Sequence, residues 1–142
     1  MTTLQVEAFY RAHHLDAPDI LTSAEDVDRM LDLLASGEES ETMASLYSKQ
    51  RENLASGFPD HEFLVGVDRE RKVGIVAFSD EVNYFPVGQY RQEGGDVEYY
   101  FTGNPREFPA GSEIPIALVR DAVVEFLLTG GKRPECIKWR EG

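Results

Sequence analysis

Three histidines are the side chains best suited to acid–base or metal chemistry in this chain. His13 and His14 precede Asp16, and His61 stands alone. A metal site needs ligands that converge from several positions, and adjacent residues on an extended segment point in opposite directions. We therefore expect His13 and His14 to be structural or solvated, and His61 to be a polar residue at the start of a strand.

The candidate nucleophiles lack the neighbours that would activate them. Cys136 has no base close to it in the sequence, and its short apolar surroundings predict a buried, unreactive thiol. The dipeptides Ser36-Gly37 and Ser56-Gly57 lack the strand–turn–helix context of a nucleophile elbow. As the only cysteine, Cys136 forms no internal disulfide, which fits a reducing cytoplasm.

The glycines and carboxylates do not define an active site either. The pairs Gly94-Gly95 and Gly130-Gly131 do not match the spacing of a phosphate-binding loop. The 26 acidic residues offer many carboxylate pairs and no means of choosing one. We predict that the chain is not an enzyme and uses no cofactor or metal.

A binding surface is a better interpretation of the acids and aromatics in the second half of the chain. Asp80-Glu81 precedes Asn83-Tyr84-Phe85-Pro86, and Asp96 to Phe101 follows the Gly94-Gly95 loop. Aromatic side chains anchor protein interfaces and carboxylates pair with Arg and Lys, although strand alternation assigns about half of these aromatics to the core. The predicted partner-binding residues are Asp80, Glu81, Glu93, Asp96, Glu98 and Tyr99.

Charge gives the clearest signal from composition. The 26 acids against 14 Lys and Arg leave a formal charge of −12. This field disfavours nucleic acid and anionic membranes as partners and attracts basic proteins, although acidity also serves solubility alone. No apolar stretch is long enough to span a bilayer, and the N-terminus lacks a signal-peptide pattern, so we expect a cytoplasmic protein.

The elements that must position these residues begin with a strand over Leu4–Tyr10. Ser23 is placed as the N-cap of a helix that ends at Gly37, with apolar residues at helical spacing. A second, weaker helix is predicted within Glu38–Gly57, from Met43, Leu46, Tyr47 and Leu54.

Strands follow over 61–68 and 73–79, joined by a charged turn, and over 82–87 and 97–102. Gly103-Asn104-Pro105 is predicted to end this run. The elements before the C-terminus are a helix that starts around Ser112–Pro115 and stops at Gly130 or Gly131, and a strand over Cys136–Arg140. These elements predict one α+β domain over residues 1–142, with a mainly antiparallel sheet of about five or six strands packed against two or three helices.

The C-terminal region carries a resemblance to a known family. Its matching pieces are Phe108-Pro109, Ser112-Glu113-Ile114-Pro115, the Ala122 to Phe126 helix, Thr129-Gly130, Arg133-Pro134 and Trp139. In these pieces the chain resembles immunity proteins of bacterial polymorphic-toxin systems, in particular the first-numbered immunity family. The resemblance extends less firmly to Thr22–Leu34 and to the strands between His61 and Phe101.

The resemblance implies an inhibitor that binds a cognate toxin, in many cases one similar to zinc-dependent cytidine deaminases. It also implies that Glu113, Pro115 and Trp139 form the fold, whereas Glu38–Gly57 departs from the family pattern. We expect a monomer that covers the basic substrate cleft of a deaminase.

Two other functions remain open at this stage. One is an acidic protein-binding module unrelated to toxins, and the other is a small enzyme with a carboxylate site. An enzyme should present a deep pocket lined by convergent polar groups, and an inhibitor an exposed acidic patch with aromatics.

Overall fold

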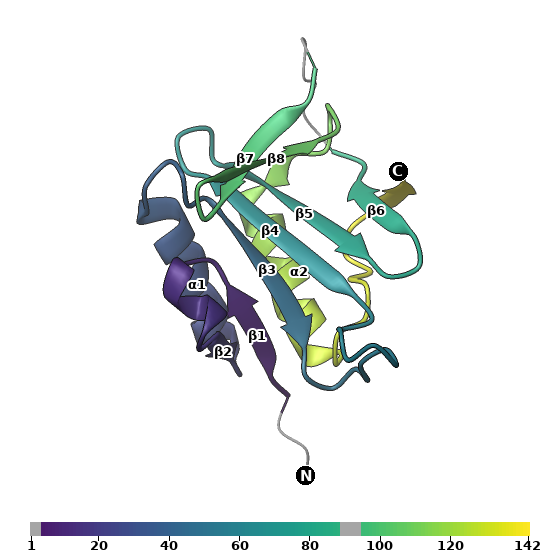
Figure 1. The fold of residues 1–142 in the computed structure, drawn as a ribbon. Helices are drawn as coiled ribbons and strands as arrows, with labels where there is room; N and C mark the ends of the chain where they lie inside the picture. Colours follow the sequence, from purple (N-terminus) through teal and green to yellow (C-terminus); the bar gives the residue numbers. More distant parts are fainter. Residues whose placement is uncertain (1–3, 89–94) are drawn as a thin grey trace.

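The computed structural model describes residues 4–88 and 95–142, in which a twisted sheet carries two helices on one face (Figure 1). The helices are α1 (Ala24–Ser36), α2 (Ile116–Leu128) and the short 3-10 helix η1 (Ala12–Leu15). The strands are β1 (Val6–Phe9), β2 (Asp19–Leu21), β3 (Met43–Ser48), β4 (Glu62–Asp68), β5 (Val73–Ser79), β6 (Asn83–Pro86), β7 (Val97–Phe101), β8 (Asn104–Phe108), β9 (Ile114–Pro115) and β10 (Trp139–Glu141).

Among the described residues, the main sheet has eight strands in the order β10-β6-β5-β4-β3-β1-β2, with β9 also paired to β5. Its pairings are antiparallel, and β7 and β8 form a separate hairpin. The predicted α+β class is therefore confirmed. The sheet has more strands than expected because short segments such as β2 and β9 pair at its margins, where two or three residues leave little sequence signal.

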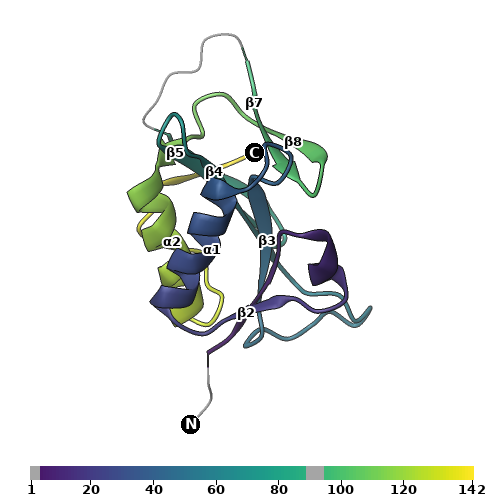
Figure 2. The ribbon, with the colours of Figure 1, turned by 90° about the vertical axis from the view of Figure 1, so that its left-hand side faces the viewer.

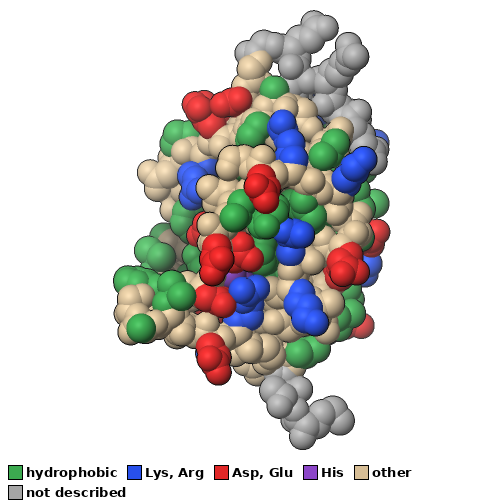
Figure 3. Space-filling model, turned by 90° about the vertical axis from the view of Figure 1, so that its right-hand side faces the viewer, with side chains coloured by type: hydrophobic (Ala, Val, Ile, Leu, Met, Phe, Trp, Pro, Cys, Tyr) green, Lys and Arg blue, Asp and Glu red, His purple; other side chains and the backbone are tan. Residues whose placement is uncertain are grey.

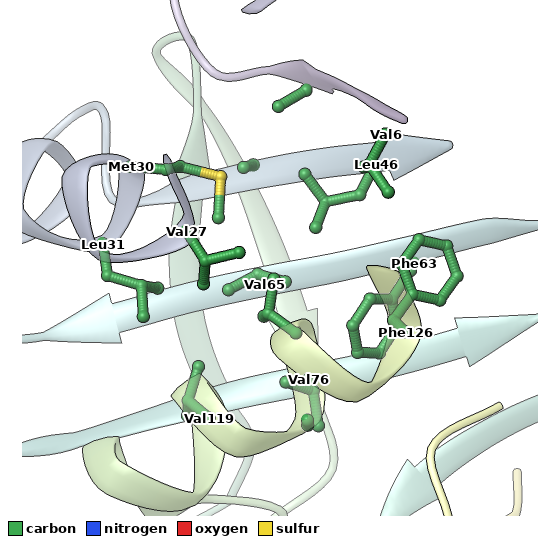
Figure 4. Close-up of a cluster of buried hydrophobic side chains, with 14 of the residues drawn as sticks. Val6, Val27, Met30, Leu31, Leu46, Phe63, Val65, Val76, Val119 and Phe126 are labelled. Atoms are coloured by element: carbon green, nitrogen blue, oxygen red, sulfur yellow. The ribbon is translucent and has the colours of Figure 1, made fainter. Parts of the chain in front are cut away.

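Helix α1 forms as its sequence predicts. The Ser23 side chain accepts a hydrogen bond from the Asp26 amide at 3.2 Å, which caps the helix. Its buried residues recur at helical spacing and face the sheet (Figure 4); they are Val27, Met30, Leu31 and Leu34. The helix ends at Gly37, as expected.

Helix α2 covers the neighbouring part of the same face. Phe126 is fully buried and stacks on Phe63 of β4 with ring centroids 4.7 Å apart, while Val119 packs in the same core cluster (Figure 4). Gly130 and Gly131 follow the helix with φ values of 71° and 93°, so the predicted left-handed stop is confirmed.

No helix among the described residues has the length and apolar character needed to cross a membrane.

The β7–β8 hairpin covers one end of the opposite face of the sheet (Figure 2). Tyr99 and Phe108 pack there against residues of β3, β4 and β5. A Cβ atom on Gly66 of β4 would lie 2.7 Å from the Tyr99 ring, so only glycine lets this ring rest on the strand. Thr42 and Tyr100 exchange hydrogen bonds that attach the hairpin beside β3.

The second helix predicted within Glu38–Gly57 is wrong, because this stretch contains β3 and a loop. Met43, Leu46 and Tyr47 have helical spacing by coincidence. The strand lies inside the sheet, and both of its faces are covered where it begins. Met43 and Ala44 are therefore both fully buried, and the polar–apolar alternation of a strand is absent there.

The predicted break at Gly103-Asn104-Pro105 is also wrong. Thr102 and Gly103 have positive φ values of 46° and 89° and form only a tight turn, after which β8 continues. Pro105 is accommodated because β8 is an edge strand. The last strand begins at Trp139 rather than Cys136 and pairs with β6.

Candidate functional site

A groove of about 660 Å³ lies at the end of the sheet where β4 turns into β5. It runs between the C-terminal end of α1, the β4–β5 turn and β7, and its floor includes the apolar Leu34 and Val67. Its charged lining consists of Glu39, Asp68, Glu70, Glu98 and Arg69. We call this feature the acidic groove, because four carboxylates and one arginine line it.

The carboxylates of the acidic groove affect the pKa of Tyr100. Its hydroxyl donates a hydrogen bond to Glu98 Oε2 at 3.2 Å. This bond, followed by the nearby charges of Glu98 and Glu39, raises the pKa of Tyr100, because each disfavours the phenolate. The groove therefore offers an aromatic hydroxyl beside carboxylates that a cation can pair with.

Behind the groove lies a fully buried carboxylate, Glu113. Arg71 donates hydrogen bonds to Glu113 Oε1 and Oε2 at 2.8 and 2.6 Å, and the Tyr99 hydroxyl donates to Oε2 at 2.5 Å. Arg71 also donates from Nε to Asp68 of the groove at 2.8 Å. The hydrogen bond to Glu113 raises the pKa of Arg71, and burial followed by Glu113 raises that of Tyr99.

Three segments that are distant in sequence meet in the Glu113 cluster, which consists of Arg71, Tyr99 and Glu113. Arg71 belongs to the β4–β5 turn, Tyr99 to β7, and Glu113 immediately precedes β9 and α2. The cluster therefore fixes two walls of the acidic groove relative to the layer formed by α1 and α2, which we call the helix layer. It agrees with the fold-forming role that the family resemblance implies for Glu113.

The predicted partner-binding residues divide between two ends of the molecule. Glu98 lines the acidic groove, and Asp96 is exposed just before β7. Asp80 and Glu81 are exposed in the β5–β6 turn, at the far end of the seven-residue strand β5. This strand separates the two groups by roughly 23 Å.

Two members of the predicted set do not belong to the described surface. Tyr99 is only 2% exposed, because its side chain is enclosed by the hairpin core and its hydroxyl is committed to Glu113. Its inclusion is corrected accordingly, since alternation turns Tyr99 inward and Glu98 and Tyr100 outward. Glu93 lies outside the described residues.

The far end of the sheet has mixed charge. A hollow of about 510 Å³ there is lined by Asp80 and Glu135 together with Arg51, Lys132 and Arg133. Figure 3, which views the molecule from the β6–β10 side, shows Lys and Arg dispersed among Asp and Glu. Acidic residues therefore predominate in the acidic groove but not on this side.

Between these two ends, part of the sheet face is not covered by the hairpin (Figure 1). It carries the half-buried side chains of Phe9, Tyr47 and Glu62, and we call it the open sheet face. The Tyr47 hydroxyl donates to Glu62 Oε2 at 2.7 Å, and Phe9 meets the Tyr47 ring edge to face. Burial, together with Glu62, raises the pKa of Tyr47 to about 12.

Two of the three histidines, His14 and His61, serve the fold. His14 is buried, and its Nδ1 accepts hydrogen bonds from the amides of Tyr10 and Arg11 at 3.2 and 3.0 Å, which confirms its structural role. His61 directly precedes β4, as predicted, and it is buried there, with Nε2 accepting from the Ser48 amide at 2.9 Å. Among residues 4–88 and 95–142, no group of three or more His, Cys, Asp or Glu could hold a metal ion.

Cys136 is exposed, which contradicts the prediction that it is buried. The reason is that β10 begins only at Trp139, so Cys136 lies in the connection before the strand. Partial burial of its thiol and the neighbouring Glu125 carboxylate raise its pKa to about 11. Little of the reactive thiolate therefore exists at neutral pH.

The structure thus combines an α+β domain with an acidic groove and an adjacent open sheet face. Residues 16–141 match the family model described as Immunity protein Imm1. This span is most of the chain, and the protein belongs to that family. It is therefore an immunity protein for a bacterial toxin. A comparison with curated proteins gave no match.

Sequence reasoning missed three of the carboxylates in the acidic groove. Glu39 follows α1, Asp68 ends β4 and Glu70 lies in the β4–β5 turn, so they become neighbours of Glu98 only on folding. The available signals were the acidic run that begins at Glu38 and the charged turn between two predicted strands.

We predict that Glu113→Gln lowers the free energy of unfolding by about 1–3 kcal/mol, because it removes a buried charge-assisted acceptor from Arg71 and Tyr99. Chemical denaturation measures this change. Asp28→Asn is the matched control, since the Asp28–Arg120 pair is 48% and 42% exposed, and should cost less than about 1 kcal/mol. Equal costs for the two variants would contradict the role assigned to Glu113.

We also predict that stability decreases as the pH falls below 6.5. Burial, the largest cause for each, lowers the pKa of His14 and His61 from 6.5, so the unfolded chain takes up protons that the folded chain excludes. The unfolding free energy should decline as the pH falls below about 6.5 and lie near its plateau at about pH 7. Denaturation across this range tests the sign, and His14→Gln should flatten the slope. A slope that is absent or reversed would contradict the assignment.

Proposed function

We propose that this immunity protein neutralises a nucleic-acid cytidine deaminase toxin by covering its basic substrate cleft, with no chemistry of its own. The partner class comes from the family resemblance, and the electrostatic argument from the acidic groove. Enzymes that act on nucleic acid carry positive clefts, which an acidic protein can occupy in place of the phosphates. The proposal places this event in the cytoplasm of the cell that makes the toxin.

The observation that carries the proposal is the acidic groove itself. Carboxylates of Glu39, Glu70 and Glu98 converge there from three segments and face a single Arg69. Its walls are held by the Arg71–Glu113 pair, so the carboxylates need little reorganisation when a basic segment arrives. On this proposal Asp96 extends the same surface, while Asp80 and Glu81 contribute a second acidic contact beyond the open sheet face.

The proposed mechanism is steric and electrostatic. A deaminase must admit an unstacked base to a pocket beside its zinc ion. A protein docked over the entrance excludes both the base and the adjoining phosphates. The net charge of −12 also speeds encounter with a positive surface, particularly at low salt.

The direct test is co-expression of the chain with the toxin domain encoded by the adjoining gene. We expect the two to co-purify, and uracil formation on single-stranded DNA or RNA to be suppressed. The toxin alone, with added zinc, provides the positive control. Undiminished deamination with no co-purification would reject the proposal for that pair.

A second test reverses charge within the acidic groove. Glu70→Lys with Glu98→Lys should slow association with the toxin by about tenfold or more at low salt, and much less at high salt where the field is screened. Stopped-flow or surface-based kinetics measures the rate. Asp80→Lys with Glu81→Lys tests the second acidic contact in the same way.

The matched control is Glu25→Lys with Asp121→Lys, two exposed acids on the helix layer. It changes the net charge by the same amount but lies away from the proposed surface. If this control slows association as much as the groove variant, overall charge explains the effect and the groove does not. Unchanged on-rates for Asp80→Lys with Glu81→Lys would remove those two residues from the interface.

A further inference from the structure

The loop between β3 and β4 projects as a rigid hairpin-like turn. Asn53 and Pro59 form a β-bridge, and the Leu54 amide donates to the Phe58 carbonyl at 2.8 Å. The Gly57 amide donates to the Leu54 carbonyl at 2.8 Å, and Gly57 has a φ of 90°, which favours glycine at the tip. We call residues Asn53–Pro59 the apolar finger.

The base of the apolar finger is clamped to the body of the protein. Arg51 donates from Nε and Nη2 to the two carboxylate oxygens of Asp60, at 2.8 and 3.1 Å. Its remaining nitrogen, Nη1, donates to the Gly131 carbonyl at 2.9 Å, just beyond α2. The clamp joins both ends of the finger to the helix layer, so the finger is held in one orientation.

The apolar finger presents two large hydrophobic side chains to solvent. Phe58 is 70% exposed and Leu54 is 55% exposed. Within the described part of the chain, Phe58 is the one aromatic among the exposed large hydrophobic residues. No atom lies within 4 Å of the position that a Cβ on Gly57 would occupy, so the tip stands clear of the protein. A rigid, protruding aromatic of this kind is typical of an interface anchor.

The apolar finger lies across the open sheet face from the acidic groove. It joins β3 to β4 at one end of these strands, whereas the acidic groove lies at their other end (Figure 1). A second hollow, of about 180 Å³, separates the finger from the open sheet face and is lined by Asn53, Pro59 and Tyr47. The predicted contact Asp80 lies close to the finger's base, because it lines a hollow with Arg51.

We infer that the apolar finger is the affinity anchor of the interface, and that Phe58 and Leu54 enter an apolar pocket on the cognate toxin. This inference rests on the proposed function. Charge indicates which protein binds the finger. A second copy of this chain would bring another charge of −12 and be repelled, whereas a basic toxin is attracted. The apolar finger and the acidic groove border the open sheet face at its two ends, and Asp80 lies near the base of the finger. A single partner that lies along this face can therefore meet all of them.

The two parts of the interface have different kinetic roles. Exposed ion pairs each change affinity by a factor of about five at most, so the acidic groove acts mainly on the rate of encounter. Burial of a preorganised aromatic and a leucine slows dissociation instead, since little side-chain or loop freedom is lost on binding. The finger should therefore govern the off-rate while the groove governs the on-rate.

The test compares binding of the toxin domain from the adjoining gene to wild type and to the double variant Leu54→Ala with Phe58→Ala. We expect the off-rate to rise about 100-fold and the on-rate at low salt to change by less than about twofold. Thermal unfolding should be unchanged, because both side chains are exposed in the free protein. Leu33→Ala, at a 41% exposed leucine on the helix layer, is the control and should leave both rates unchanged.

The outcomes separate this inference from the proposed function. Absence of toxin binding by wild type would reject both. Tight binding by wild type with the same off-rate in the double variant would reject the anchor alone. Sedimentation of wild type without toxin should give a monomer, and a dimer that the double variant abolishes would show that the finger serves self-association, which would also overturn the inference.

Discussion

The buried carboxylate of Glu113 is the constraint on which the shape of this protein depends. A charge with no solvent exposure is costly unless it is paired and hydrogen-bonded, and here Arg71 and the Tyr99 hydroxyl meet that need. To reach it, the β4–β5 turn and the β7–β8 hairpin must both approach the segment before α2. The same approach brings Asp68 and Glu98 to the rim of one groove, so the interaction that completes the core also forms the proposed binding surface.

The two faces of the sheet are covered to different extents. One face is covered by α1 and α2, whose apolar stripes enclose Phe63, Val65 and Phe78. The opposite face is covered by the hairpin only at one end, which leaves the open sheet face between the acidic groove and the apolar finger. On the proposed function, the open sheet face and the two features that border it bind the toxin, while the helix side maintains the fold.

The elements that were predicted correctly carry their signal locally. Ser23 and the apolar spacing after it specify α1, and the charged turn between two apolar runs specifies the β4–β5 hairpin. Strand β3 was missed because burial on both faces removes alternation. The acidic groove was missed because its carboxylates come from separate segments. The partners of Glu113 lie 42 and 14 residues away, so only the family resemblance implied a fold-forming role for it, and no neighbouring residue indicated its burial.

Backbone hydrogen exchange with and without the toxin domain tests the central claim most directly, because it maps which face of the sheet the toxin covers. The account predicts added protection at the acidic groove, in β7, in the apolar finger and in the β5–β6 turn, with the exposed faces of α1 and α2 unchanged. Protection confined to the helix layer, with the groove and finger exchanging as in the free protein, would contradict it.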